Sequence, residues 1–398
     1  MIFSKRRMIW ILGLATLVLI GLAAYAYFIG TRALLNHAEA FSFRRMNVAQ
    51  LADQGDFRFF YVTNRLPGKA DGSPEERFKS ERDEALKFGF FDTSIQPTLG
   101  LGMIIDPSEW FLNEEIQLQD VQAQEREVFV EALRKQVQAS PYRSLLIVVH
   151  GFREAYPSAL RKTAFLAHVL DIDTPVLVFD WPGDQGSSLR GYRRARGVAQ
   201  DSGAELADTL RLIVEEVKPE RLWLMANSMG GQVVADAFSH LYQDPEFGDS
   251  QTEIENVMLT APDVGHEEFN DQFKKEITAL AKNVTVYVSS NDRALLVSRV
   301  INRGQRLGES TLDPSNPGQV EETVQLSELL EKDNDRVVLV DVTPVNRTRN
   351  FHNFSLETPE FFDDLFLRFT GSVMPKSREL YLLQTPRGAH YFVLTRGR

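Results

Sequence analysis

The amino-acid sequence predicts an α/β fold built on a mostly parallel, doubly wound sheet. Runs of apolar or β-branched residues recur along the chain and begin near residues 144, 176, 222, 256, 284 and 337. Each run meets a charge only near its end, which is typical of strands that are covered on both faces. Segments long enough for a helix separate the runs, and residues 189–217 carry apolar side chains at helical spacing. This alternation of strands and helices predicts the doubly wound sheet.

The segment before the first of these runs predicts additional strands. Residues 57–65, FRFFYVTNR, form an apolar run that predicts one strand. Residues 66–82 are rich in proline, glycine and charge, so they predict a loop. The short apolar pieces within 84–122 predict further antiparallel strands at one edge of the sheet.

A polar stretch interrupts the alternation near its end. Residues 302–336 contain clusters of glycine, proline and aspartate around a short helical pattern, and we interpret them as an insertion between the last two strands. The predicted domain therefore covers residues 57–370. The extension that follows, residues 371–398, predicts a β-hairpin.

Composition limits the classes of function. The chain has 398 residues, of which 43% are hydrophobic, and this is enough to bury one large core. A formal net charge of -11 disfavours nucleic acid as a partner. The absence of cysteine excludes disulfides, thiolate zinc sites and a cysteine nucleophile. No P-loop, HExxH or dinucleotide-binding motif is present, and we expect no cofactor and no metal.

The N-terminal segment predicts a membrane anchor. Residues 8–30 contain no charge and are long enough to cross a bilayer. Lys5, Arg6 and Arg7 precede this run, so the short tip is expected in the cytoplasm and the rest of the chain across the membrane. Residues 1–30 would form the tip and anchor, and 31–56 a juxtamembrane stalk. The alternative is a secretory signal peptide that is cleaved near Ala26.

The motif MANSMGG at 225–231 carries the main functional signal. Ser228 follows an apolar strand directly and precedes a segment with a helical pattern, the context of a nucleophile elbow. The turn is so sharp that the residues two before and two after the serine must be small. Ala226 and Gly230 meet this requirement, so we expect Ser228 to be a nucleophile.

An earlier motif predicts the oxyanion hole. VVHGF, at 148–152, ends a predicted strand, and a His-Gly pair in this place is common in oxyanion holes. The backbone N–H groups of Phe152 and Met229 are the predicted donors, which would stabilise charge that appears in the transition state. We expect the His150 side chain to be structural, because it precedes the nucleophile in a fold that orders its residues as serine, acid, histidine.

The base and the acid are expected to follow Ser228 in the chain. His352 follows the last predicted strand and is the preferred base among the later histidines, which are His240, His266, His352 and His390. Asp292 and Asp263 each follow a strand and are both candidates for the acid. Asp292 is preferred because it follows the last strand but one. Asp263 is kept as the alternative acid, and its other interpretation is that it caps the segment beginning at Val264 or holds a nearby loop.

Several of these motifs together resemble a bacterial α/β-hydrolase family of unknown function, whose members are often anchored to a membrane. The motifs are YVTNR, VVHGF, FDWPG, ANSMGG, TAPD and SSNDRAL, and the resemblance covers roughly residues 57–370. It implies an α/β-hydrolase fold and a serine, aspartate and histidine triad at Ser228, Asp292 and His352. Asp180 stands in FDWPG where a small residue is expected, and we expect a neighbouring arginine to neutralise it.

These expectations combine into one functional hypothesis. The chain is expected to be a serine hydrolase that cleaves a carboxylic ester or thioester through an acyl-enzyme, without a metal or a cofactor. Its substrate would be a small or lipid-like acyl compound, and its domain would lie in the periplasm of a bacterium, held to the inner membrane by the N-terminal helix. The alternatives are acyl transfer by the same residues and a binding protein that retains the fold.

Overall fold

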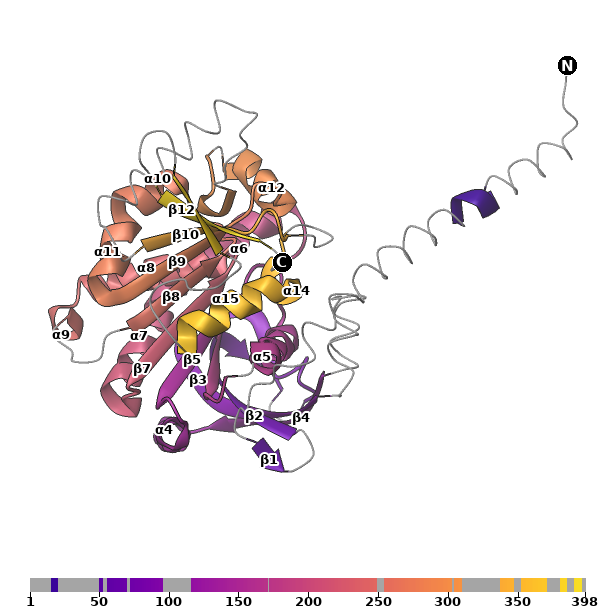
Figure 1. Cartoon of the computed structure of the whole chain (residues 1–398). Helices are drawn as coiled ribbons and strands as arrows, with labels where there is room; N and C mark the ends of the chain where they lie inside the picture. Colours follow the sequence, from indigo (N-terminus) through magenta and orange to yellow (C-terminus); the bar gives the residue numbers. More distant parts are fainter. Residues whose placement is uncertain are drawn as a thin grey trace, which may run out of the picture.

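The structure is a computed structural model of the whole chain (Figure 1). It describes residues 16–20, 50–52, 56–69, 72–95, 116–170, 172–248, 254–302, 304–309, 337–346, 352–370, 380–384 and 390–395.

One twisted sheet organises the described part of the chain. Its order is β11-β12-β10-β9-β8-β7-β5-β6-β2-β3-β4, with β1 paired to β2. The six neighbouring strands from β10 to β6 all pair in parallel, which confirms the predicted mostly parallel sheet. Those strands are β5 (Ser144–Val149), β6 (Val176–Asp180), β7 (Arg221–Asn227), β8 (Ile254–Thr260), β9 (Ala281–Val288) and β10 (Val337–Asp341).

Helices cover both faces of this sheet, as a doubly wound fold requires. Successive residues of each parallel strand face opposite sides, and two separate hydrophobic clusters result. One cluster packs against α4 (Arg126–Ala139), α6 (Leu189–Asp201), α7 (Gly203–Leu212), α8 (Gly230–Tyr242) and α11 (Lys274–Leu280). The other packs against α5 (Tyr156–Leu170), α14 (Phe354–Glu357) and α15 (Pro359–Thr370). The remaining short helices are η1 (Ile213–Val217), α9 (Pro245–Gly248), α10 (His266–Glu268), η2 (Phe269–Phe273) and α12 (Arg293–Asn302).

The predicted antiparallel strands at one edge of the sheet are present, but they are longer than predicted. β2 (Asp56–Pro67) and β3 (Phe78–Ile95) form one long hairpin, and β4 (Ile116–Gln124) continues it. The predicted loop at 66–82 is therefore shorter, because Pro67 pairs with Phe78 and Arg65 with Arg82. Arg82 also forms an ion pair with Glu205 of α7, a contact that sequence propensity does not reveal.

The helical segment at 189–217 is broken into α6, α7 and the π-helix η1. The break falls at Ser202, which ends α6 and precedes Gly203. A Cβ atom on Gly203 would lie 2.5 Å from the Cβ of Asp236 on α8, so only glycine permits this close contact between α7 and α8. The interruption lies at a Ser-Gly pair, a sequence at which helices commonly kink.

The predicted insertion at 302–336 begins later than expected. Arg306, Leu307 and Gly308 are buried, and the short helix η3 (Leu307–Glu309) packs at the ends of the strands. The Gly308 N–H donates to Pro262 O at 3.0 Å, and the Ser289 N–H donates to Gly308 O at 2.9 Å. Residues 306–308 therefore belong to the core of the domain. Residues 310–336 lie outside the described residues.

The C-terminal segment joins the main sheet. β11 (Leu380–Gln384) and β12 (His390–Leu394) pair in an antiparallel hairpin, and β12 pairs in parallel with β10. Leu394 is fully buried in one of the two hydrophobic clusters. The domain therefore does not end at residue 370, and the hairpin forms one edge of the sheet.

The predicted anchor falls mainly outside the described residues. Residues 16–20 are helical, and the apolar side chains of residues 17–20 are more than half exposed. Within the part of the chain that the structure describes, there is no helix with the length and hydrophobicity needed to span a bilayer. Most of the predicted stalk also lies outside, although β1 (Gln50–Ala52) pairs with β2.

Candidate active site

Ser228 occupies a strained turn between β7 and α8. β7 ends at Asn227 and α8 begins at Gly230, so the chain reverses direction within two residues, Ser228 and Met229. Its φ angle is 53°, in the left-handed region that residues other than glycine rarely adopt. The Ser228 N–H donates to Thr260 O of β8 at 2.9 Å, and this bond helps to hold the turn.

The need for small residues around Ser228 comes from β5. A Cβ atom on Gly230 would lie 2.5 Å from His150 O and 2.7 Å from Val149 O. A Cβ atom on Gly151 would lie 3.1 Å from the Cβ of Ser228. The sequence argument placed the crowding between residues 226 and 230, whereas the backbone at the end of β5 is what Gly230 approaches.

Two backbone N–H groups are available beside the serine. Among the described residues, neither the Phe152 N–H nor the Met229 N–H donates to another backbone group. Phe152 follows Gly151, whose Cα lies against Ser228, and Met229 is the next residue after the serine. Both amides can therefore donate to an oxyanion that forms next to the Ser228 hydroxyl.

His352 and Asp292 form a close pair. The His352 Nδ1 atom lies 2.7 Å from Asp292 Oδ2. The Asp292 carboxylate is 1% exposed, and its other oxygen accepts hydrogen bonds from the N–H groups of Ala294 and Leu295, each at 3.0 Å. One aspartate thus caps α12 and also orients the imidazole, so the capping role and the acid role are compatible.

The environment of His352, including the Asp292 carboxylate, shifts the pKa of its imidazole. Burial lowers the pKa of His352, but the charge of Asp292 and its hydrogen bond outweigh burial, and the net effect raises the pKa above its usual value of 6.5. Asp263 raises it further and Lys162 lowers it. The arrangement favours the imidazolium that forms when histidine accepts a proton.

Ser228 and His352 face the same cavity, which has a volume of about 590 Å³. No hydrogen bond between their side chains is found among the described residues, and in enzymes without substrate this bond is often long. The cavity wall combines apolar side chains of α6 and α12 with polar groups from the ends of β5 and β7. Those lining residues include Phe152, Arg153, Glu154, Lys162, Leu189, Tyr192, Asn227, Leu295, Val297, Ile301 and Asn353.

Asp263, the alternative acid, has other partners. Its Oδ1 atom accepts from Arg306 Nε at 2.6 Å and from Ser298 Oγ at 2.6 Å, and its Oδ2 atom accepts from Tyr192 OH at 2.7 Å. Both Asp263 and Arg306 are buried. Asp263, which itself lines the cavity, therefore links α6, α12 and the residues before η3.

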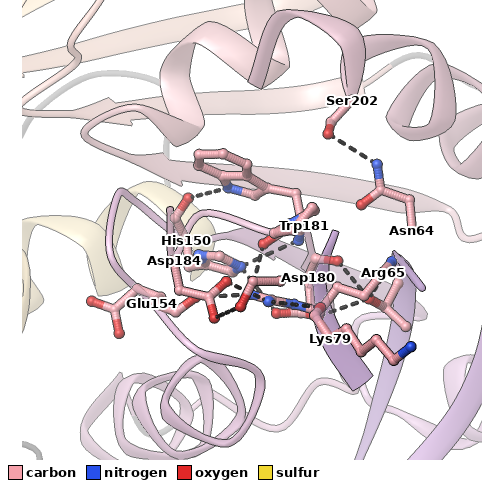
Figure 2. Close-up of polar contacts among 12 residues, drawn as sticks. Asn64, Arg65, Lys79, His150, Glu154, Asp180, Trp181, Asp184 and Ser202 are labelled. Carbon is pink, nitrogen blue, oxygen red and sulfur yellow. Dashed lines mark hydrogen bonds and ion pairs between the residues drawn. The ribbon is translucent and has the colours of Figure 1, made fainter. Parts of the chain in front are cut away.

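Asp180 is neutralised by an arginine, as expected (Figure 2). Arg65 Nε lies 2.8 Å from Asp180 Oδ2, and Arg65 Nη1 lies 2.5 Å from Asp184 Oδ1. Burial raises the pKa of Asp180, but the Arg65 charge and the hydrogen bond from His150 outweigh it and hold that pKa below its usual range. Arg65 also donates to the carbonyl oxygens of Glu154 and Trp181. It thereby ties β2 to the loop that carries Phe152.

His150 belongs to the same network. Its Nε2 atom lies 3.1 Å from Asp180 Oδ1, and its ring stacks on Trp181 with 5.6 Å between centroids (Figure 2). Trp181 Nε1 donates to His150 O at 2.8 Å. The side chain faces this network, so it holds the end of β5 in place.

Sequence reasoning missed two cavity residues. Glu154 and Lys162 form an ion pair on the cavity wall. Burial raises the pKa of Glu154, but the Lys162 charge and hydrogen bonds outweigh it and lower the pKa below its usual value. The one available signal was the position of Glu154 two residues after the VVHGF motif. Among the described side chains, His240 and His266 are not part of the cavity lining, and the side chain of His390 lies outside what the structure describes.

No cation-binding cluster accompanies these residues. Within the described part of the chain, no group of three or more histidine, aspartate or glutamate side chains is placed to hold a metal ion.

Comparisons with known proteins give a family and distant structural likenesses. No curated protein matches the chain. An esterase from Pyrococcus furiosus is 13% identical with a TM-score of 0.33, and the match covers 57% of this chain and 80% of that chain. A thermophilic esterase from Thermogutta terrifontis is 14% identical with a TM-score of 0.31, covering 59% and 86%. A lipase-esterase related protein from Clostridium acetobutylicum is 12% identical with a TM-score of 0.28, covering 56% and 93%.

These solved structures are too distant to support any statement about substrate.

The family model described as "Alpha/beta hydrolase of unknown function (DUF900)" matches residues 125–363, more than half of the chain. The matched range includes the elbow at Ser228, the strand ends at Asp263 and Asp292, and His352. The chain therefore belongs to this α/β-hydrolase family.

Proposed function

We propose that the chain is a serine hydrolase that cleaves a carboxylic ester or thioester through an acyl-enzyme. One observation carries the proposal. Ser228, in a left-handed elbow, faces the same cavity as an imidazole whose Nδ1 atom lies 2.7 Å from a buried carboxylate. A nucleophile, a base and an orienting acid arranged in this way are the components of covalent acyl transfer.

Each residue would have a defined role. His352 Nε2 takes the Ser228 hydroxyl proton as Oγ attacks the carbonyl carbon. The N–H groups of Phe152 and Met229 stabilise the oxyanion of the tetrahedral intermediate. His352 returns the proton to the leaving alcohol or thiol, and Asp292 holds the imidazole in the required orientation throughout. Water then attacks the acyl-enzyme by the same steps and releases the carboxylic acid.

The location of the enzyme is a separate proposal. We propose that residues 8–30 anchor the chain in a bacterial inner membrane and that the catalytic domain lies on the periplasmic side. The uncharged run and the three cations before it support this orientation. The substrate would then be a small or lipid-like acyl compound that is accessible on that side.

A fluorophosphonate probe tests the proposed nucleophile. The purified full-length protein should be labelled at Ser228, and Ser228→Ala should abolish labelling and lower ester turnover by roughly a thousandfold or more. Ser187→Ala is the matched control, because Ser187 lines the same cavity, and this variant should keep its labelling. If the Ser228→Ala protein were still labelled, the assignment would be wrong.

A further inference from the structure

Two helices form one wall of the cavity and pack against each other. Tyr192 OH of α6 lies 2.8 Å from Ser298 Oγ of α12. Asn302 Nδ2 of α12 donates to Tyr192 OH at 2.9 Å, and Arg196 Nη1 of α6 donates to Asn302 Oδ1 at 2.8 Å. Leu189 of α6 and Val297 of α12 both line the cavity. The outer faces of the two helices therefore form one continuous surface beside the cavity mouth, which we call the α6–α12 face.

The α6–α12 face exposes several large apolar side chains. On α12, Leu296 is 44% exposed, Val297 is 57% exposed and Val300 is 79% exposed. On α6, Leu189 is 59% exposed. The three residues of α12 lie at helical spacing on its outer side, while Leu295 and Ser298 face inward and are buried. A contiguous exposed apolar patch beside a cavity mouth marks an interaction surface.

Exposed arginines accompany these apolar side chains on α6 and at the cavity wall. Arg190, Arg193 and Arg194 of α6 are exposed, and so is Arg153, which lies on the cavity wall. Among the described residues, none of these four arginines forms an ion pair with another side chain. By contrast, Arg196, on the same helix, is paired with Glu268.

Two acidic groups near this face are already engaged. Glu154 of the cavity wall is paired with Lys162, and Glu309 interacts with Arg299 and accepts the Arg306 N–H. The chain as a whole carries a net charge of -11, so this local excess of unpaired cations is opposite in sign to the rest of the molecule. The complementary partner is an anionic surface with an apolar layer beneath it.

We propose that the α6–α12 face docks on a bilayer that contains anionic phospholipids. The side chains of Leu296, Val297 and Val300 enter the boundary between headgroups and acyl chains, while the arginines bind lipid phosphates. A helix with apolar residues on one side and cations around them binds a bilayer in this way. The docked face turns the cavity mouth toward the lipid, so a membrane-borne ester can reach Ser228 without crossing water. This surface is distinct from the N-terminal segment proposed as an anchor.

The absence of cysteine makes a site-specific test possible in the full-length chain. Val300→Cys carries a polarity-sensitive fluorophore on the proposed face. Val128→Cys is the matched control, because Val128 is a valine on a helix, α4, and is 56% exposed. α4 lies at the opposite end of the molecule from α12 (Figure 1). Both labelled proteins are reconstituted in vesicles of phosphatidylcholine alone and of phosphatidylcholine mixed with phosphatidylglycerol.

The proposal predicts a distinct pattern. The label at residue 300 should shift to the blue and be quenched by lipid-borne spin labels, and only in the vesicles with phosphatidylglycerol. The label at residue 128 should stay water-like in both. Arg193→Glu with Arg194→Glu should lower the ratio of docked to undocked protein by at least about thirtyfold. Two equivalent charge reversals on α4, Arg126→Glu with Arg134→Glu, should change the ratio of docked to undocked protein little.

Three results would overturn the docking proposal. The label at 300 could remain water-like in both lipids, or it could be quenched equally in neutral vesicles. It could also shift to the blue without quenching by lipid-borne spin labels and in proportion to protein concentration, which would mean that a second copy covers the face. Fluorophosphonate labelling of Ser228 in the same samples reports the proposed activity independently, so each proposal can fail without the other.

Discussion

At the scale of single residues, Asp263 and Asp292, which follow the neighbouring strands β8 and β9, have different contacts. Asp292 contacts His352, and Asp263 contacts Arg306, Tyr192 and Ser298. Order along the chain was enough to prefer Asp292 over Asp263. The sequence did not reveal what Asp263 does, because its partners come from segments 35 to 71 residues away and become neighbours only through packing of the helices.

The raised pKa of His352 predicts the acid limb of the activity profile. His352 acts as a base only when neutral, so kcat/KM should rise with pH through the raised pKa, which lies above 6.5. Asp292→Asn removes the charge that raises this pKa while burial still lowers it. The acid limb of the residual activity should therefore move to lower pH. An unchanged limb in this variant would show that another group controls it.

Asp263→Asn should mainly affect stability. The substitution leaves the buried Arg306 without a carboxylate, and breaking a buried ion pair costs about 3–5 kcal/mol. Asp292→Asn is the matched comparison, and it should instead lower turnover by roughly 10⁴-fold, as the same change does in a serine protease. Denaturant unfolding and ester hydrolysis of both variants check this. The assignment of the acid is wrong if Asp263→Asn is the inactive protein while Asp292→Asn keeps its turnover.

At the scale of elements, the sequence predicted the parallel strands well, and it predicted the edge strands without their full extent. The strands β5 to β10 are buried on both faces, so their apolar runs were visible in the sequence. β3 is different, because its first residues are charged and form a strand through pairing with β2 and through the ion pair of Arg82. Likewise, the close contact of Gly203 with Asp236 of α8 depends on helix packing, which no local pattern contains.

The inserted segment has two parts with different expected effects. Deleting residues 312–334 should leave the melting temperature nearly unchanged and shift the preferred acyl-chain length, because the segment follows η3 near the strand ends where such sheets bind ligands. A deletion that also removes residues 305–309 should unfold the domain, since it removes Arg306 and the hydrogen bonds of Gly308 to the strand ends. Thermal melts and a series of esters separate the two effects. Loss of folding in the shorter deletion would place residues 312–334 in the core.

At the scale of the whole molecule, residues from distant parts of the chain converge on one edge of the sheet. Ser228 follows β7, Asp292 follows β9, and His352 comes after β10. The rule that parallel strands present their carboxyl ends together made this convergence predictable. The buried network around Arg65 was not, because it joins β2 to β6 through partners 115 to 119 residues away. Sequence reasoning thus located the candidate catalytic side chains better than the buried residues that hold the surrounding strands and loops in place.

The last prediction concerns the orientation of the chain in a membrane. Lys5, Arg6 and Arg7 precede the uncharged run at 8–30, so the short tip should stay in the cytoplasm and the domain should cross. The docking face proposed on α6 and α12 would then meet the periplasmic leaflet. A reporter that is active only in the periplasm should therefore be active when fused after Arg398. Changing the three N-terminal cations to glutamate is the matched control and should reduce that activity. The intact mass of the mature protein determines whether the chain is cleaved near Ala26, which would release the domain. If a reporter active only in the cytoplasm worked at the same position, the orientation would be reversed, and the α6–α12 face could dock only on the cytoplasmic leaflet.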